Sequence, residues 1–262
     1  MQVQSTQESA LDDSQFPLLK AIFAPQSLEV LVSHLDEGKC LVMSGAENKF
    51  ENLVTLDDIE RRLNDGSNAS IFAQVIKEGT RHSLVDSNTP WTPSALRKSA
   101  VTEELQAGNS IMLASSSQIN QALARLCFEL ESLFSDASMH ADVHLYVSVD
   151  ERGNSYDAHR DRPQHKLLLQ AVGETEWQLF DAKEELADHV SAVPSEDQDK
   201  LLEETAAFTL KQGDLLYMPP GTFHKVSSTP GPRISISIPF FSMPEASRMD
   251  RSHIPFAQLF SS

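Results

Sequence analysis

The sequence predicts an α+β protein in which a mixed α/β N-terminal half packs onto a β-barrel formed by the C-terminal half. Three observations carry this prediction. Apolar residues recur at helical spacing before residue 135, short β-branched and aromatic segments follow from residue 143, and Gly, Pro and Asp separate those segments as in an all-β barrel or sandwich. A chain of 262 residues suits one large domain or two small ones.

In the N-terminal half, helices are expected at residues 26–35, 55–63 and 118–134, with short strands at 39–43 and 70–76. Thr55 is the expected N-cap of the second helix, because Asp57 and Asp58 follow in the first turn, where the helix dipole favours acidic side chains. The Pro-containing stretch 87–93 is expected to be a loop.

In the C-terminal half, seven short strands are expected, at residues 143–149, 166–172, 176–180, 207–210, 214–218, 224–228 and 233–240. Ser and Ile alternate from Ser235 to Ile238, which predicts one buried face for the last strand. An acidic, helix-compatible insert at 184–204 interrupts the series and is expected to lie over one edge.

The chain is expected to divide into a flexible leader (1–14), an N-terminal α/β region packed on the barrel (15–135), the barrel (136–243) and a short C-terminal tail (244–262). The two large regions are not expected to be independent domains. Apolar residues at 254–260 leave two possibilities for the tail, which either packs back on the protein or pairs with a second subunit in a homodimer.

The charge and the cysteines restrict the partners and the compartment. Acidic residues outnumber basic ones 38 to 21, and the formal charge of −17 disfavours binding to nucleic acid or to an anionic membrane. The N-terminus lacks a signal peptide and no apolar run approaches the length of a spanning helix. Cys40 and Cys127 form no CxxC motif, which suits a reducing compartment, so a cytoplasmic protein is expected.

Three residues have the pattern of a metal site: His159, Asp161 and His224. Residues i and i+2 of an extended segment point to the same side, so His159 and Asp161 are expected to face one way. His224 follows a Pro-Pro-Gly turn at the start of another predicted strand. Two imidazoles and one carboxylate on one side of a metal leave the other side open, as in the facial triad of non-haem Fe(II) oxygenases.

Residues 143–240 resemble the JmjC-type cupin fold, and specifically its ribosomal-oxygenase-like (cupin-4) branch. The resemblance is carried by LYVS at 145–148 before HRD at 159–161, by LLLQ at 167–170 before GE at 173–174 and WQLF at 177–180, and by GDLLYMPPGTFH at 213–224. A weaker match in the N-terminal half extends it to residues 40–241. The resemblance implies a double-stranded β-helix (jelly-roll) barrel.

The resemblance also implies an Fe(II)- and 2-oxoglutarate-dependent oxygenase. Members of this family convert 2-oxoglutarate to succinate and hydroxylate a side chain of a protein, peptide or amino-acid-derived substrate. By this analogy, His159, Asp161 and His224 bind the iron.

The sequence departs from the family where the far carboxylate of 2-oxoglutarate is bound. Family members commonly carry Lys or Arg two residues before the conserved Trp, and this chain has the uncharged Thr175 before Trp177. Arg233 and Ser235 offer a substitute, since both lie on one face of the last strand and many other 2-oxoglutarate oxygenases have an Arg-x-Ser pair there. Lys166 is a second candidate for the anchor, and Tyr146 matches a tyrosine near the cosubstrate.

His144, Tyr156 and His165 are weaker candidates for the wall of a substrate pocket. Two other functions remain open from sequence alone. Thr175 leaves room for a metallo-cupin lyase, isomerase or dioxygenase that does not use 2-oxoglutarate. A non-catalytic JmjC-like module that binds a peptide is the other, although such a module has no need of an open metal triad.

Overall fold

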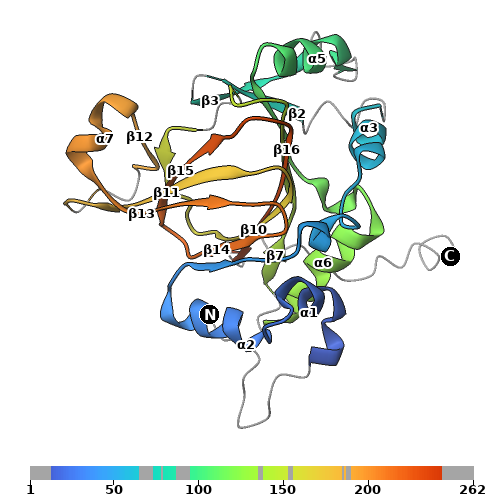
Figure 1. Ribbon diagram of the computed structural model, residues 1–262, viewed down its shortest axis with the longest axis vertical. Helices are drawn as coiled ribbons and strands as arrows, with labels where there is room; N and C mark the ends of the chain where they lie inside the picture. The colour runs from blue at the N-terminus through green and yellow to red at the C-terminus, as the bar shows by residue number, and fades with distance from the viewer. Residues whose placement is uncertain are drawn as a thin grey trace, which may run out of the picture.

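The computed structural model describes residues 13–64, 73–77, 79–86, 95–134, 138–152, 156–184, 186 and 190–243. Two antiparallel β-sheets face one another, and helices cover the outer side of the larger one (Figure 1). Within these residues no strand pairing joins the two sheets, so the expected barrel is an open jelly-roll of two sheets. The expected α+β class is confirmed.

The larger sheet has the strand order β1-β14-β10-β16-β8-β6-β2-β3, and β7 also pairs with β16. It unites the two halves of the chain. Its strands are β1 (Leu41–Met43), β2 (Ala73–Lys77), β3 (Thr80–Ser83), β6 (Ser110–Leu113), β7 (Met139–Ala141), β8 (His144–Ser148), β10 (His165–Val172), β14 (Leu215–Met218) and β16 (Arg233–Ser242).

The smaller sheet has the order β12-β9-β15-β11-β13. Its strands are β9 (Ala158–His159), β11 (Thr175–Ala182), β12 (Ala192–Val193), β13 (Leu202–Leu210) and β15 (Phe223–Ser228). A separate hairpin pairs β4 (Val85–Asp86) with β5 (Ala95–Leu96).

The helices are α1 (Pro17–Phe23), α2 (Glu29–Glu37), α3 (Leu56–Asn64), α5 (Lys98–Gln106), α6 (Gln121–Ser132) and α7 (Ser195–Leu201), with 3-10 turns η1 (Asp13–Gln15), η2 (Glu47–Phe50) and η4 (Ser116–Gln118). Figure 1 shows α1 and α2 at the bottom, α5 at the top and α7 at the left-hand side. None of these helices is long and apolar enough to cross a membrane.

Local sequence explains where several helices begin. Thr55 and Asp58 exchange hydrogen bonds at the start of α3, with each side chain accepting from the other residue's backbone N–H, at 3.1 and 3.0 Å. This capping box is the one that the sequence predicts at Thr55. Asn120 caps α6 by accepting from the N–H of Leu123. The helix expected at 118–134 therefore starts three residues later.

Alternation along the strands separates two packing layers. In β16, Ile234, Ile236, Ile238 and Phe240 face the helices in the main hydrophobic core, while Arg233, Ser235 and Ser237 line a cavity between the sheets. In β10, Leu167 and Leu169 join the same main core, and Leu168 packs against Trp177 between the sheets. The two-residue period of a strand thus sends each side chain to the core or to the cavity.

The remaining predictions on structure have mixed outcomes. The acidic insert at 184–204 does not simply lie over an edge, because β12 forms the edge of the smaller sheet by pairing with β9 and residues 202–204 belong to β13. Among the described residues of the insert, the helical part is α7. The loop at 87–93, leader residues 1–12 and the tail from 244 onward lie outside the described residues, while Asp13 and Ser14 belong to η1.

Candidate functional site

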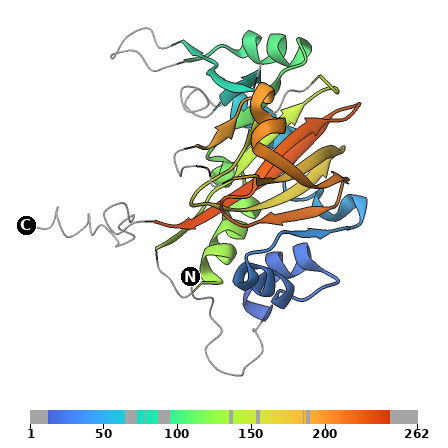
Figure 2. The ribbon, with the colours of Figure 1, turned by 90° about the vertical axis from the view of Figure 1, so that its left-hand side faces the viewer.

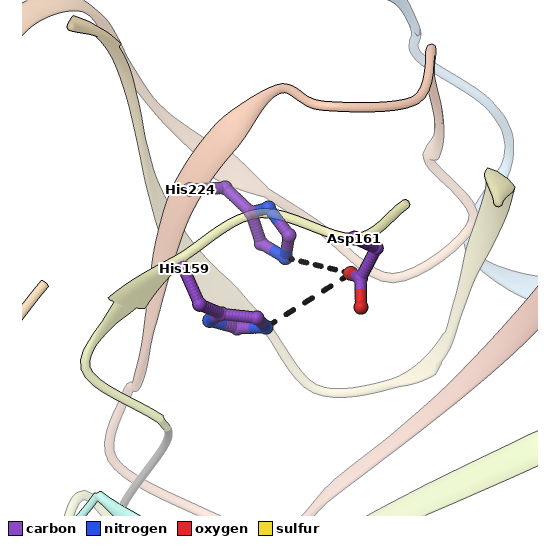
Figure 3. Close-up of side chains that lie close together, drawn as sticks. All are labelled: His159, Asp161 and His224. Carbon is purple, nitrogen blue, oxygen red and sulfur yellow. Dashed lines mark ion pairs between the residues drawn. The ribbon is translucent and has the colours of Figure 1, made fainter. Parts of the chain in front are cut away.

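The smaller sheet brings His159, Asp161 and His224 together (Figure 3). His159 ends β9 and pairs directly across the sheet with His224, the second residue of β15. Asp161 lies two residues past His159, just after the strand. One ligand atom from each residue lies within 4.8 Å of the others, and Oδ2 of Asp161 is 4.0 and 3.7 Å from Nε2 of His159 and His224.

Backbone carbonyls orient both imidazoles. Nδ1 of His159 lies 2.9 Å from the carbonyl oxygen of Asp157, and Nδ1 of His224 lies 3.0 Å from that of Thr222. A carbonyl only accepts, so Nδ1 carries the proton and Nε2 presents its lone pair toward Asp161. Burial lowers the pKa of both histidines and keeps them neutral. Neutral imidazoles held in this tautomer are the form that binds a metal.

Lys166 reaches the same carboxylate from the facing sheet. Its Nζ lies 2.6 Å from Oδ2 of Asp161. Burial opposes ionisation of Asp161, but the charge of Lys166 and the hydrogen bond that it donates outweigh this effect and lower the pKa of the carboxyl. Asp161 is therefore an anion at neutral pH, as a metal ligand must be.

A narrow inner chamber of about 50 Å³ lies between the sheets beside these residues. His159 and His224 line its wall, and Arg233 and Ser235 line it further along. Arg233 pairs with Ser148, whose Oγ meets Oγ of Ser228 across the two sheets at 3.3 Å. Ser228 lies four residues after His224 in β15, which is about 13 Å along the strand. Arg233 thus lies at the end of the chamber where the sheets approach one another.

Arg233 is buried, with 4 % of its surface exposed. One guanidinium nitrogen, Nη2, donates to Oγ of Ser110 at 3.1 Å, and among the described residues Nε has no hydrogen-bond partner. Burial lowers the pKa of Arg233 to about 10, so it remains a cation at neutral pH. Its described contacts include no carboxylate. A buried cation without an anionic partner destabilises the folded protein, and a bound anion would offset this cost.

Two serines of β16 add polar groups to the chamber. Oγ of Ser235 donates to Oε1 of Gln170 at 2.9 Å. Within the described part of the chain, the buried Oγ of Ser237 has no partner. Together with Arg233, they give the chamber a polar strip beside its apolar lining residues Ile76, Leu168 and Val226.

A wider outer cleft of about 550 Å³ opens beside the inner chamber. Tyr146, Tyr156, His159 and Lys166 line both spaces, whereas His224 lines only the chamber and Asp161 only the cleft. The metal-ligand triad therefore lies where the two spaces meet. This arrangement offers two separate routes to one centre, from the chamber and from the cleft.

The other candidates that reach these spaces are two tyrosines and one histidine. Tyr146 is half-buried, and desolvation of its hydroxyl raises its pKa to about 12. The ring of Tyr156 meets the ring of His159 edge-on, with centroids 5.0 Å apart. His144 lines the outer cleft, and burial lowers its pKa to about 4. All three are neutral at neutral pH.

Two of the expected site residues lie elsewhere. Thr175 is buried outside the chamber lining, and its hydroxyl donates to Gln170 and accepts from Nε1 of Trp177. His165 points to the helix side of the larger sheet, where it lies 2.9 Å from the hydroxyl of Tyr217 and stacks on Phe240. His165 faces away from the chamber because its neighbour Lys166 faces into it, and successive side chains of a strand point to opposite sides.

Sequence reasoning missed two residues that line these spaces. Trp177, which the sequence did not mark as a site residue, stacks on His224 with ring centroids 5.8 Å apart and lines the chamber. Arg81 comes from β3 in the N-terminal half and covers the ring of Tyr156, 5.4 Å from its centroid. No motif marks Arg81 in the sequence, since only the pairing of β3 and β2 in the larger sheet brings it there.

Comparison with known proteins finds relatives that are named as an oxygenase and as a demethylase and hydroxylase. The chain is 26% identical over 195 residues to the bifunctional lysine-specific demethylase and histidyl-hydroxylase NO66 of Drosophila sechellia, which covers 72% of this chain and 28% of the relative. It is 41% identical over 65 residues to ribosomal oxygenase 2 of Bos taurus, which covers 25% of this chain and 13% of the relative. The chain thus spans less than a third of the length of either relative.

Solved structures of the ribosomal oxygenase YcfD from Escherichia coli share the fold. One matches with a TM-score of 0.53 at 16% identity, covering 86% of this chain and 54% of the other. A complex of YcfD with cobalt and 2-oxoglutarate matches with a TM-score of 0.54 at 15% identity, covering 82% and 52%. At this identity the likeness establishes the fold.

The family assignment rests on the sequence itself. The family model for the JmjC domain matches residues 113–249, slightly more than half of the chain. This segment contains the three metal-ligand candidates and every strand of the smaller sheet. The resemblance noted in the sequence is confirmed, and the chain belongs to the JmjC domain family.

Proposed function

We propose that this protein is an Fe(II)- and 2-oxoglutarate-dependent oxygenase that hydroxylates a side chain of a protein, peptide or amino-acid-derived substrate. The observation that carries the proposal is the buried cation Arg233, whose Nε lacks a described partner, in the chamber that two of the metal-ligand candidates, His159 and His224, also line. A dicarboxylate that binds a metal at one end and a guanidinium at the other fits these two groups.

The ligand set fits iron. Two neutral imidazoles and one ionised carboxylate converge from one sheet, and the neighbouring chamber and cleft leave their other side accessible. This is the donor set of the 2-His-1-carboxylate triad, with His159, Asp161 and His224 as ligands. Bound Fe(II) and 2-oxoglutarate would supply oxidative decarboxylation coupled to hydroxylation of the substrate.

The residues of the chamber fit 2-oxoglutarate. Arg233 would bind the far carboxylate, with Ser235 on the same face of β16 and Tyr146 on the neighbouring strand β8, where it is the register partner of Ser235. Thr175 does not contribute to this binding, since its hydroxyl is engaged with Gln170 and Trp177. The positive charge that family members carry at the position of Thr175 would thus come from Arg233 on β16.

The other residues of the site position groups and keep water out. The carbonyls of Asp157 and Thr222 hold the proton on Nδ1 of each histidine, so that Nε2 stays free for the metal. Lys166 holds the Asp161 carboxylate. Trp177, Leu168 and Val226 give the chamber apolar walls, which strengthen the attraction between Arg233 and a bound carboxylate.

The outer cleft supports an amino-acid side chain as the group that reacts. It has a volume of about 550 Å³ and is lined by His159 and Asp161, and Arg233 is not among the described residues that line it. The relatives named ribosomal oxygenase 2 and histidyl-hydroxylase NO66 support a protein substrate. A cytoplasmic location and a homodimer formed through residues 254–260 remain parts of this proposal, and those residues lie outside the described ranges.

A metallo-cupin reaction without 2-oxoglutarate is the second candidate. It is favoured by one observation, the uncharged Thr175 where the resemblance leads one to expect Lys or Arg. The buried Arg233 weighs against it, because a reaction without an anionic cosubstrate leaves this cation without a counterpart. The converging ligand set argues against a module that only binds peptides.

The decisive experiment is an anaerobic titration of the Fe(II)-loaded protein with 2-oxoglutarate, followed by visible absorption. We expect a saturable, weak charge-transfer band that shows chelation of the metal by the keto acid. His224→Ala is expected to abolish iron binding and the band together. Bound iron without a band would exclude 2-oxoglutarate and favour the second candidate.

A further inference from the structure

The outer cleft has the opposite charge to the protein as a whole. The chain carries a formal charge of −17, yet the described residues that line the cleft include the cations Arg81, Arg160, Arg162 and Lys166 and only two carboxylates, Asp157 and Asp161. Salt screens the remote acidic residues over about 8–10 Å, so a ligand in the cleft responds mainly to these nearby charges. The cleft therefore favours an anion.

Several of these charges are already engaged. Lys166 and Asp161 form an ion pair at 2.6 Å. The guanidinium of Arg160 donates from Nε to the carbonyl of Val190 at 2.9 Å and stacks on the ring of Phe223, away from the triad. Asp157 accepts a hydrogen bond from Ser195 at 2.7 Å. Arg81, for whose side chain the described residues provide neither an ion pair nor a hydrogen bond, is therefore the cation of this cleft best placed to bind a ligand.

Arg81 is placed to meet a substrate rather than to stabilise the fold. Its side chain is exposed on β3 and lies over Tyr156, whose ring in turn contacts His159. A group bound to Arg81 would therefore lie one aromatic ring away from the metal-ligand triad.

We propose that the substrate presents a carboxylate to Arg81 in the outer cleft, so that an acidic group next to the reacting side chain selects the substrate. This inference deepens the proposed function and rests on it, since it identifies the cleft as the substrate site. A carboxylate can come from an Asp or Glu side chain or from the free C-terminus of a peptide. The chemistry at Arg81 is the same for both sources.

The test is a selection of random heptapeptides for binding to the full-length protein without added metal or 2-oxoglutarate. Heptapeptides are too large for the inner chamber, so binding there at Arg233 does not interfere. In one arm the peptides are displayed through their C-terminus and offer only side-chain carboxylates. In the other arm they are displayed through their N-terminus and carry a free C-terminal carboxylate.

We expect Asp or Glu to be enriched at one position in the first arm, or binding confined to free C-termini in the second. Replacing that carboxylate by its amide is expected to weaken binding to the wild-type protein about tenfold, as for one charge-assisted contact. The same replacement is expected to have no effect on Arg81→Gln and an intermediate effect on Arg81→Lys. Lys20→Gln, which removes an exposed charge on α1, serves as the charge-matched control and should behave as wild type.

Selected pools without a carboxylate preference would overturn the inference, and so would a preference that survives in Arg81→Gln. Because the selection needs neither metal nor 2-oxoglutarate, its failure is distinct from a failure of the proposed reaction. A carboxylate preference without a charge-transfer band would keep the cleft assignment and exclude the oxygenase. A charge-transfer band without a carboxylate preference would support the oxygenase and overturn the assignment of the cleft.

Discussion

At the scale of single residues, Arg233 and Lys166 are two cations with different tasks. Arg233 lies at the end of the chamber near Ser148, whereas Lys166 pairs with Asp161 beside the triad. We expect Arg233→Ala to raise the Michaelis constant for 2-oxoglutarate by about 30-fold or more, because a buried charge–carboxylate contact contributes about 2 kcal/mol or more. Steady-state kinetics with varied 2-oxoglutarate measures this constant.

Lys166→Ala is the matched comparison, since it removes the other cation that lines the chamber. Its Michaelis constant for 2-oxoglutarate is expected to change less than that of Arg233→Ala. The reverse order would mean that Lys166 anchors the cosubstrate and would leave the buried Arg233 unexplained.

His165 makes the stability of the fold depend on pH. Burial against Tyr217 and Phe240 lowers its pKa to about 4, while in the unfolded chain the value is about 6.5. The unfolded state therefore binds more protons, and stability is lost as the pH falls from about 6.5 toward about 4. We expect His165→Gln to reduce the loss of unfolding free energy between about pH 7 and pH 5 by about 1 kcal/mol, after allowing for solvent screening.

Urea unfolding at the two pH values measures this difference. The control is His82→Gln, which removes an exposed histidine on β3. An unchanged pH dependence in His165→Gln, or an equal change in His82→Gln, would contradict the prediction.

The sequence was sufficient to predict the triad and insufficient for its surroundings. His159, Asp161 and His224 follow from residue type, spacing and the turn before His224. The position of His165 depends on which face of β10 it occupies, and a shift of one residue reverses that face. Thr175 shares a face of β11 with Trp177, and the contacts of its hydroxyl with Gln170 and Trp177 depend on packing that spacing does not show. Arg81 depends on pairing between strands far apart in sequence, which local patterns do not determine.

At the scale of elements, the turn at Gly213, between β13 and β14, contacts the segment at Gly45 and Ala46 that follows β1. Gly213 has a φ of +90°, and a Cβ there would lie 2.1 Å from the carbonyl oxygen of Ala46. Asp214 binds the same segment by accepting from the N–H of Gly45 at 3.0 Å. Gly213→Ala is expected to lower the free energy of unfolding by about 3 kcal/mol, because strain and a backbone clash add.

Gly231→Ala introduces backbone strain without a steric clash, so it separates the two effects. Gly231 also has a positive φ, of +100°, but a Cβ there would meet nothing within 4 Å. We expect it to lose only about 1 kcal/mol in urea unfolding. Equal losses in the two variants would show that the contact with Ala46 does not matter.

Elements with strong local signals were predicted best. The start of α3 follows from its capping box, and the alternation of β16 follows from its Ser and Ile residues. The acidic insert was predicted less well, because β12 is only two residues long and is defined by its pairing with β9. An edge strand of that length has no periodicity to detect.

At the scale of the whole molecule, the larger sheet makes one unit of the two halves of the sequence. β8 pairs with β6 on one side and β16 on the other, so strands from before and after residue 135 belong to one hydrogen-bonded array. In the strand order of this sheet, β1 on one side and β6, β2 and β3 on the other flank the strands of the second half. The main hydrophobic core is likewise shared, with Leu19 and Leu123 from the first half and Leu145 and Ile236 from the second. Neither half can bury its apolar face alone.

We therefore expect one cooperative unfolding transition. Trp91→Phe would leave Trp177, in the smaller sheet, as the single tryptophan of the chain. Urea unfolding followed by its fluorescence should coincide with unfolding followed by far-ultraviolet circular dichroism, which reports on the helices of the N-terminal half as well. Two separate midpoints would instead mean that residues 15–135 and 136–243 unfold independently. In that case Arg81, carried by the N-terminal strand β3, would be held over Tyr156 by a movable interface, and the carboxylate preference of the cleft would weaken with the less stable half.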